Sequence, residues 1–224
     1  MSISGRDLPL FPLNVVLFPK VILPIHVFEE RYKLMIKACL EGDKKFGVVL
    51  IKSGSEVGEP AMPHSVGTIA EIVDVVYLEG GRMNITTLGR EPFRILEITQ
   101  QKPYINGRVE LLQEDSRVTP EVMAQADKVR RYFQNYILLL ASLVEVDVKD
   151  ISLEVEPVEL SYLVGGALRV GSWEKQALLE MSSLEERLQE EIRIMKHENI
   201  ILKMFSDRKT KGQASDEAGE EPSG

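Results

Sequence analysis

The side chains that most often take part in chemistry are few in this sequence and stand far apart. His26, His64 and His197 have no second histidine or cysteine at metal-binding spacing, and the HExxH motif is absent. Cys39 is the single cysteine, so neither an intrachain disulfide nor a cysteine zinc site can form. We therefore predict structural or solvated roles for these four side chains, with no metal and no other cofactor.

Motifs for phosphate binding and acid–base catalysis are also missing. The sequence has no Gly-Lys pair and no two glycines two positions apart, which excludes the GxxxxGK[ST] and GxGxxG loops. The densest group of acids is Glu185, Glu186, Glu190 and Glu191, which flanks Arg187. On a surface helix such a group is most simply a solvated face rather than a carboxylate pair. These observations predict a protein that is not an enzyme.

The remaining charged candidates are four arginines on or between consecutive predicted strands, namely Arg82, Arg90, Arg94 and Arg108. They either gather into a small basic patch or pair with acids across strands, and we favour pairing because opposite charges on neighbouring strands stabilise each other. The formal net charge of the chain is −8. Proteins that bind nucleic acids usually carry a basic face, so binding of DNA or RNA is not expected.

Residues 8–32, which read LPLFPLNVVLFPKVILPIHVFEERY, must form the core around which these side chains are placed. The prolines in this stretch remove backbone donors and exclude a helix, so it must form short strands. Its side chains are too apolar for a solvated loop. The spacing of apolar residues over 28–40 then predicts a helix.

The rest of the chain predicts strands first and helices later, which is the α+β pattern. β-Branched runs and turn residues predict strands at 46–51, 68–78, 83–88, 93–99 and 104–112, with a mobile lip at 52–67. Thr119 followed by Pro120 predicts the start of an amphipathic helix. Further helices are expected to start at Pro157, at Ser172, which would cap a short helix, and at Ser183, which would form a capping box with Glu186.

Two separated motifs resemble the Lon N-terminal domain. LPLFPL, VLFP and LPIHVFEERY resemble its opening, and ELSYLVGGALRVGSWEKQALLEMSSLEERL at 159–188 resembles its helical end. The resemblance implies an α+β fold in which a PUA-like β pseudo-barrel is followed by a C-terminal helical bundle. The expected boundaries are an N-terminal arm at 1–7, a β-rich subdomain at 8–115, a helical subdomain at 116–205 and, from its polar composition, a disordered tail at 206–224.

The same resemblance implies a noncatalytic module that recognises substrates. Such a module would hold exposed apolar or unfolded polypeptide segments, as an adaptor or chaperone-like factor in protein quality control, with a protease or other quality-control component as a further candidate partner. The candidate binding residues form a polar rim to an apolar groove: Phe28, Glu29, Glu30, Arg31 and Tyr32, together with Arg90 and Arg94. For Glu29 to Arg31 the structural alternative is preferred, in which the acids favour a helix dipole and the arginine ties down a loop.

Two other functions stay open at this point. PUA-like barrels bind RNA in other families, which makes RNA binding the alternative function, although the net acidity opposes it. An enzyme with a pocket between the two subdomains has no residue constellation in its favour. The longest apolar run, Tyr136–Val144, is too short to cross a bilayer and the N-terminus lacks signal-peptide features, so a cytoplasmic location is expected. The resemblance implies a bacterial protein. The sequence does not decide the oligomeric state.

Overall fold

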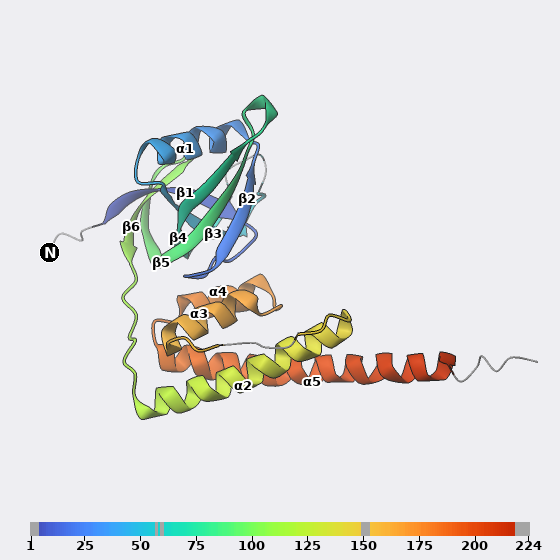
Figure 1. The fold of residues 1–224 in the computed structure, drawn as a ribbon. Coiled ribbons are helices and arrows are strands. Elements are labelled where there is room, and N and C mark those ends of the chain that lie inside the picture. Colours follow the sequence, from blue (N-terminus) through green and yellow to red (C-terminus); the bar gives the residue numbers. More distant parts are fainter. Residues whose placement is uncertain (1–4, 57, 59–60, 149–152, 218–224) are drawn as a thin grey trace, which may run out of the picture. The chain divides into compact units, whose positions relative to one another are not determined.

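The computed structural model describes residues 5–56, 58, 61–148 and 153–217 of the chain (Figure 1). These residues form the strands β1 (Arg6–Leu13), β2 (Ile22–Val27), β3 (Lys45–Ser53), β4 (Met62–Tyr77), β5 (Met83–Gln100) and β6 (Ile105–Leu111). The helices are α1 (Glu30–Glu41), α2 (Pro120–Leu143), α3 (Pro157–Ala167), α4 (Ser172–Glu180) and α5 (Leu184–Glu217), with a 3₁₀ turn η1 (Glu79–Gly81). The predicted α+β class is confirmed.

The six strands form one sheet that closes on itself through β5. The strand order is β2-β5-β4-β3-β1-β6, and β5 also pairs with β6. β5 can do this because it is 18 residues long: residues 83–88 pair with β2, and residues 93–100 pair with β6. The ring β5-β4-β3-β1-β6 is the expected PUA-like pseudo-barrel, and β2 is an edge strand outside it.

The proline-rich opening segment forms β1 and β2, as predicted, and each proline in these strands lies where its strand, within the described part of the chain, pairs on one side only: Pro9 with β6, Pro12 with β3 and Pro24 with β5. Pro24 lies in β2, an edge strand that pairs only with β5 among the described residues, and sheets tolerate a proline without a backbone donor in edge strands. Helix α1 follows and buries Tyr32, Met35 and Ile36 in the same apolar cluster as Phe11 and other strand residues. This packing of a helix against the barrel fixes the start of α1 at the end of β2.

Two strands differ from their predicted bounds. β4 begins at Met62, so residues 62–67 of the predicted mobile lip pair with β3, and residues 57, 59 and 60 of the lip lie outside the described residues. The strands predicted at 83–88 and 93–99 are one continuous strand. In both cases proline and glycine resembled breaks, whereas the sheet accommodates them through shifts of register.

The chain groups into two compact units that differ from the predicted division at 115/116. The first, the barrel unit, comprises residues up to 116 together with 162–183, and the second, the helical unit, comprises 117–161 and residues from 184 onward. The division falls inside α3. Residues 162–183 join the barrel unit because their side chains bond to it: Gln176 Nε2 donates to the Val66 carbonyl at 3.0 Å, and Tyr162 Oη donates to Glu114 at 2.8 Å.

Gly165 and Gly166, in the second half of α3, allow parts of the barrel unit to approach the helix closely. A Cβ atom added at Gly165 would lie 2.8 Å from the ring of Phe18, which is fully buried, and one at Gly166 would lie 2.7 Å from Val21. The role of this glycine pair is therefore to permit the close approach of a neighbour.

We expect Gly165→Ala to destabilise the barrel unit, because the Phe18 ring has no free space into which to move. Overpacking of this kind costs about 1–3 kcal/mol of stability, which exceeds the stability that alanine gains over glycine through its higher helix propensity. Urea unfolding followed by the fluorescence of Trp173, the single tryptophan, measures the effect in the same unit. The control is Ala38→Gly on the exposed face of α1, which should cost only about 1 kcal/mol. Equal stability of Gly165→Ala and wild type would contradict the prediction.

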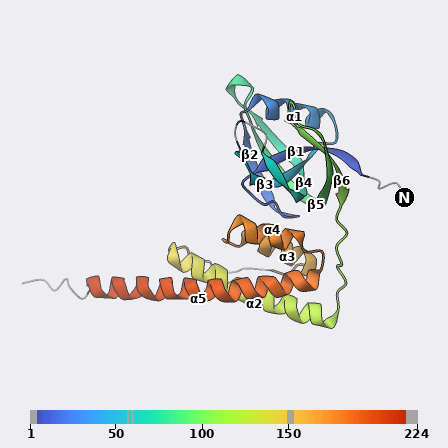
Figure 2. The same ribbon diagram turned by 180° about the vertical axis from the view of Figure 1, so that it is seen from behind.

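In the helical unit, α2 and α5 run parallel and lie side by side (Figures 1 and 2). As predicted, Thr119 caps α2, since its hydroxyl accepts a hydrogen bond from the Val122 amide at 3.3 Å. Two predictions about helix α5 are wrong. Arg187 and Glu191, assigned to a solvated face, are fully buried. Arg187 lies three residues after Leu184 and Glu191 three residues after Leu188, so both are on the inner face, where the Ser161 hydroxyl bonds to both.

The second correction concerns the end of the chain. Helix α5 continues to Glu217, whereas a disordered tail was expected from 206; residues 218–224 of that tail lie outside the described residues. Residues 206–217 contain no proline, and extending an existing helix costs much less than starting one. At the other end, Arg6 and Asp7 of the predicted arm already pair with β6. Among the described residues no helix has the length and apolar character needed to span a membrane.

Candidate functional site

A pocket of about 380 Å³ opens in the barrel unit where β1, β2 and the first turn of α1 meet. Its walls are mostly apolar, and Glu29 and Glu56 are the acids that line it. The apolar lining residues are Phe11, Leu13, Val15, Leu23, Pro24, Ile25, Val27, Phe28 and Tyr32, and His26 completes it. An apolar floor with a few polar groups is typical of sites that bind a ligand by its shape.

The aromatic wall of this pocket is rigid. Tyr32 stacks on Phe11 with ring centroids 3.9 Å apart and planes inclined by 21°. Burial raises the pKa of Tyr32 to about 12, and the neighbouring Arg31 only partly offsets this effect. The phenol therefore stays neutral at physiological pH and acts as a packing surface rather than as an acid or a base.

Arg31 braces the mouth of the pocket. Its guanidinium lies 3.1 Å from the Glu29 carboxylate, donates to the Glu56 carbonyl at 3.2 Å and sits 4.5 Å from the centre of the Tyr32 ring. It thereby ties the segment after β3 to the start of α1, which is the structural role that the sequence favoured. Glu30 points elsewhere and pairs with Lys33 at 2.8 Å.

Two shallower hollows continue this pocket along α1 and the β4–β5 hairpin. The first shares His26 and Phe28 with the pocket and reaches Lys33, whose ammonium donates to the Gly80 carbonyl at 2.8 Å. The second extends from Lys33 past Leu34 to Tyr77. Phe28, Leu34 and Tyr77 are 47%, 53% and 71% exposed. We call this continuous surface, from the 380 Å³ pocket through Phe28 and Leu34 to Tyr77, the β2–α1 groove. Large exposed apolar side chains with a charged rim are typical of interaction surfaces.

The structure brings together only some of the seven candidate residues. Phe28, Glu29 and Tyr32 line the pocket, and Arg31 braces it. Arg90 and Arg94, on β5, line neither the pocket nor the two hollows that continue it.

Two of the four strand arginines form the ion pairs with acids that the sequence favoured. Arg90 Nε bonds to Glu71 Oε2 at 2.7 Å, and this bond holds the pKa of the Glu71 carboxyl below its usual value. Arg108 lies 3.7 Å from Glu97. Arg94 is exposed opposite Glu110 in the register of β5 and β6. Arg90 and Arg108 are thus engaged with acids, as cross-strand pairing predicts.

Sequence reasoning missed Leu34, Glu56 and Tyr77. Leu34 stands on the outer face of α1, and Tyr77 stands beside the Glu79-Gly80-Gly81 turn, where polar residues are usual. Large apolar side chains at positions expected to be solvated were the signal for both. Glu56 had no such signal, because its position depends on the bond from Arg31 to its carbonyl.

The described residues of the groove contain neither a metal-binding cluster nor a reactive thiol. No three His, Cys, Asp or Glu side chains of the described residues are placed to hold a metal ion. Cys39 lies on the inner face of α1, and burial raises the pKa of its thiol to about 12, so the reactive thiolate does not form at neutral pH. What the arrangement offers is apolar surface and hydrogen-bonding edges.

Comparison with known proteins identifies the family. The model of the ATP-dependent protease La (LON) substrate-binding domain matches residues 7–197. The chain belongs to the LON substrate-binding domain family. Lon protease 2 of Syntrophobacter fumaroxidans is 31% identical over 187 residues, which are 82% of this chain and 23% of that protein. Lon protease of Anaeromyxobacter dehalogenans is 28% identical over 213 residues, 93% of this chain and 25% of that protein. The chain thus spans about a quarter of the length of these Lon proteases.

Solved structures of LON domains share the fold. The Lon N-terminal domain protein from Xanthomonas campestris matches with a TM-score of 0.62 at 24% identity, over 82% of this chain and 95% of that one. The N-terminal domain of the Mycobacterium avium complex Lon protease also has a TM-score of 0.62, at 17% identity, over 87% of this chain and 98% of that one. The pseudo-barrel and the helices that follow it are therefore the LON domain fold.

Proposed function

We propose that this chain is a noncatalytic binding module that holds exposed apolar or unfolded polypeptide segments in the β2–α1 groove. It acts as an adaptor or chaperone-like factor in the quality control of bacterial cytoplasmic proteins. The observation that carries the proposal is the exposure of Phe28, Leu34 and Tyr77 along a groove with an apolar floor and a charged rim. Membership of a family described as substrate-binding supports it.

The dimensions of the groove favour short apolar segments over a folded partner. A cavity of about 380 Å³ has room for one or two large side chains, and the shallower hollows beside it hold the flanking chain. Each large apolar side chain that becomes buried contributes about 1.5–3 kcal/mol. A disordered segment loses entropy on docking, so dissociation constants of roughly 1–100 μM are expected.

Backbone pairing adds a smaller contribution at β2. Within the described residues β2 pairs on one side only, with β5, so its other edge is open to an extended peptide. Pro24 removes a donor in the middle of this six-residue strand. A peptide can therefore pair with part of the edge, and apolar anchors must supply most of the affinity.

The test measures binding of a fluorescently labelled small protein that reduction and alkylation keep unfolded. We expect the variant Phe28→Ser/Leu34→Ser/Tyr77→Ser to bind this probe at least about tenfold more weakly than wild type, because three apolar anchors are lost. The matched control is Leu96→Ser/Ile98→Ser/Leu111→Ser, which changes three exposed side chains of β5 and β6 away from the groove. It should bind like wild type.

Two results would contradict the proposal. Equal loss of binding in both triple variants would mean that apolar surface in general, and not this groove, holds the probe. Hydrolysis of ATP or of peptide bonds by the purified chain would overturn the noncatalytic part. RNA binding has less support, because Arg90 and Arg108 are engaged with Glu71 and Glu97.

A further inference from the structure

A second groove lies in the helical unit, along the line where α2 and α5 run side by side (Figures 1 and 2). Its volume is about 870 Å³, and its walls come from residues 125–135 of α2 and 189–203 of α5. Nothing in the proposed function uses this surface. It belongs to the other compact unit, so the two proposals stand or fall separately.

The charge of this groove is opposite to that of the chain. Lys128 and Arg131 of α2 and Lys196 and Lys203 of α5 line it, and no acid does, although the chain carries a formal net charge of −8. Within the described part of the chain none of these four cations has an ion pair within 4 Å. We call this surface the basic groove.

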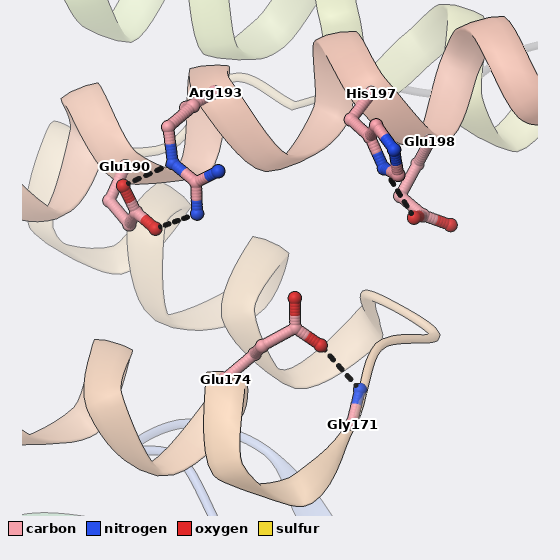
Figure 3. Close-up of polar contacts among 6 residues, drawn as sticks. All are labelled: Gly171, Glu174, Glu190, Arg193, His197 and Glu198. Carbon is pink, nitrogen blue, oxygen red and sulfur yellow. Dashed lines mark hydrogen bonds and ion pairs between the residues drawn. The ribbon is translucent and has the colours of Figure 1, made fainter.

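The neighbouring acids of α5 bond to side chains other than these four cations, and Glu185 accepts from Gln125 and Gln189 Nε2 at 3.4 and 3.2 Å. Figure 3 shows Glu190 bonded to Arg193, with Nε and Oε2 2.8 Å apart, and Glu198 beside His197, with Oε1 and Nδ1 3.4 Å apart. None of these four residues lines the basic groove. Its positive potential is therefore left for a ligand.

The floor between the cations is partly apolar and holds an unused acceptor. Tyr132 and Ile192 lie there beside Ile200, which is 63% exposed. Asn199 is 91% buried; its Nδ2 donates to the Tyr132 carbonyl at 3.1 Å, whereas its Oδ1 has no hydrogen-bond partner among the described residues. A buried acceptor without a partner costs free energy that a donor from a ligand would recover.

We infer that the basic groove binds an acidic amphipathic segment of another protein. Its carboxylates would face the four cations, its apolar side chains would cover Tyr132, Ile192 and Ile200, and an amide N–H would reach Asn199 Oδ1. Grooves lined by helices select a peptide by apolar contacts that fix its position and by complementary charges that exclude other partners.

The same cations fit RNA less well. Single-stranded nucleic acid binds on exposed aromatic faces, but Tyr132 is the one aromatic residue in the lining, and Lys196 Nζ already lies 5.7 Å from the centre of its ring. An exposed isoleucine in the middle of the groove favours an apolar side chain over a phosphate. These features assign the groove to a polypeptide.

The test uses fluorescence anisotropy with a labelled synthetic peptide in which glutamate and leucine alternate at helical spacing. We expect Lys128→Glu/Lys196→Glu to weaken binding roughly tenfold or more at low salt, because two attractions become repulsions. The matched control, Lys102→Glu/Arg208→Glu, makes the same change in net charge at exposed sites outside the groove and should stay within about twofold of wild type. Added salt should weaken the wild-type interaction most.

Comparison probes decide between this occupant and others. A peptide with glutamine in place of glutamate should bind much more weakly, and an RNA hairpin of similar charge should not compete. The inference is overturned if the glutamine peptide binds equally well or if the hairpin binds better than the acidic peptide. It is equally overturned if no probe binds at about 1 mM protein, since a dissociation constant of that size corresponds to a binding free energy of only roughly −4 kcal/mol. It is also overturned if sedimentation shows a dimer that Lys128→Glu/Lys196→Glu dissociates, since a second copy would then fill the groove.

Discussion

Replacing Arg187 by methionine is expected to lower the free energy of unfolding of the helical unit by about 3–5 kcal/mol, because it removes the buried positive charge that shares the Ser161 hydroxyl with the buried Glu191 carboxylate. Arg187 and Glu191 are fully buried, one turn apart on the inner face of α5. The Ser161 hydroxyl links them, accepting from Arg187 Nε at 2.7 Å and donating to Glu191 Oε1 at 2.7 Å. Methionine keeps the length of the side chain but none of these bonds.

Urea unfolding followed by circular dichroism at 222 nm measures this loss, since the helical unit supplies most of the helix. The variant Arg187→Met/Glu191→Leu should recover most of the stability, because replacing both buried charges by apolar side chains leaves no uncompensated charge and is close to neutral. Arg193→Met, which breaks an exposed ion pair on the same helix (Figure 3), should cost under about 1 kcal/mol. If Arg187→Met alone cost as little, the buried network would contribute no net stability.

The Arg187 network also marks a limit of prediction from sequence. Five charged residues at 185–191 correctly indicate a helix with one polar face, but periodicity alone cannot separate a charge that faces solvent from one that faces a hydroxyl on another helix. Glu185 and Arg187 differ in burial because Ser161, 26 residues before Arg187, lies opposite the latter. Only the tertiary fold supplies that partner.

Features that depend on a few neighbouring residues, such as helix caps and prolines, were predicted correctly from the sequence. Thr119 before Pro120 predicted the start of α2, and the prolines of residues 8–32 predicted strands rather than a helix, because caps and missing donors act within a few residues. The closure of the barrel was beyond such reasoning. It depends on β5 pairing with both β2 and β6, and the register of those pairs arises from contacts across the whole unit.

The residues of the candidate site likewise fall into those that one motif predicted and those that only the tertiary fold brings together. Phe28, Glu29 and Tyr32 are consecutive or nearly so, and a single motif predicted them together. Tyr77 joins them only through the β4–β5 hairpin, and the basic groove joins Lys128 to Lys196 across 68 positions of sequence. Arg90 and Arg94 were grouped with the site by their charge, but their strand positions place them with Glu71 and opposite Glu110.

Tyr32→Ala is expected to cost the barrel unit about 3–5 kcal/mol, the usual range for truncating a buried aromatic ring to alanine. Tyr32 is 95% buried, stacks on Phe11 and forms one wall of the β2–α1 groove. Its removal leaves Phe11 without its stacking partner and enlarges the pocket. Trp173 fluorescence during urea unfolding reports the loss in the same unit.

Tyr32→Phe separates the ring from the hydroxyl. No hydrogen bond of the Tyr32 hydroxyl occurs among the described residues, and its pKa of about 12 keeps it neutral, so removing it should change stability by less than about 1 kcal/mol. The phenylalanine variant should also bind the unfolded probe at least as tightly as wild type, because the groove becomes more apolar. If Tyr32→Phe lost as much stability or binding as Tyr32→Ala, the hydroxyl and not the packed ring would be the group that matters, and the groove would recognise its ligand by a polar contact.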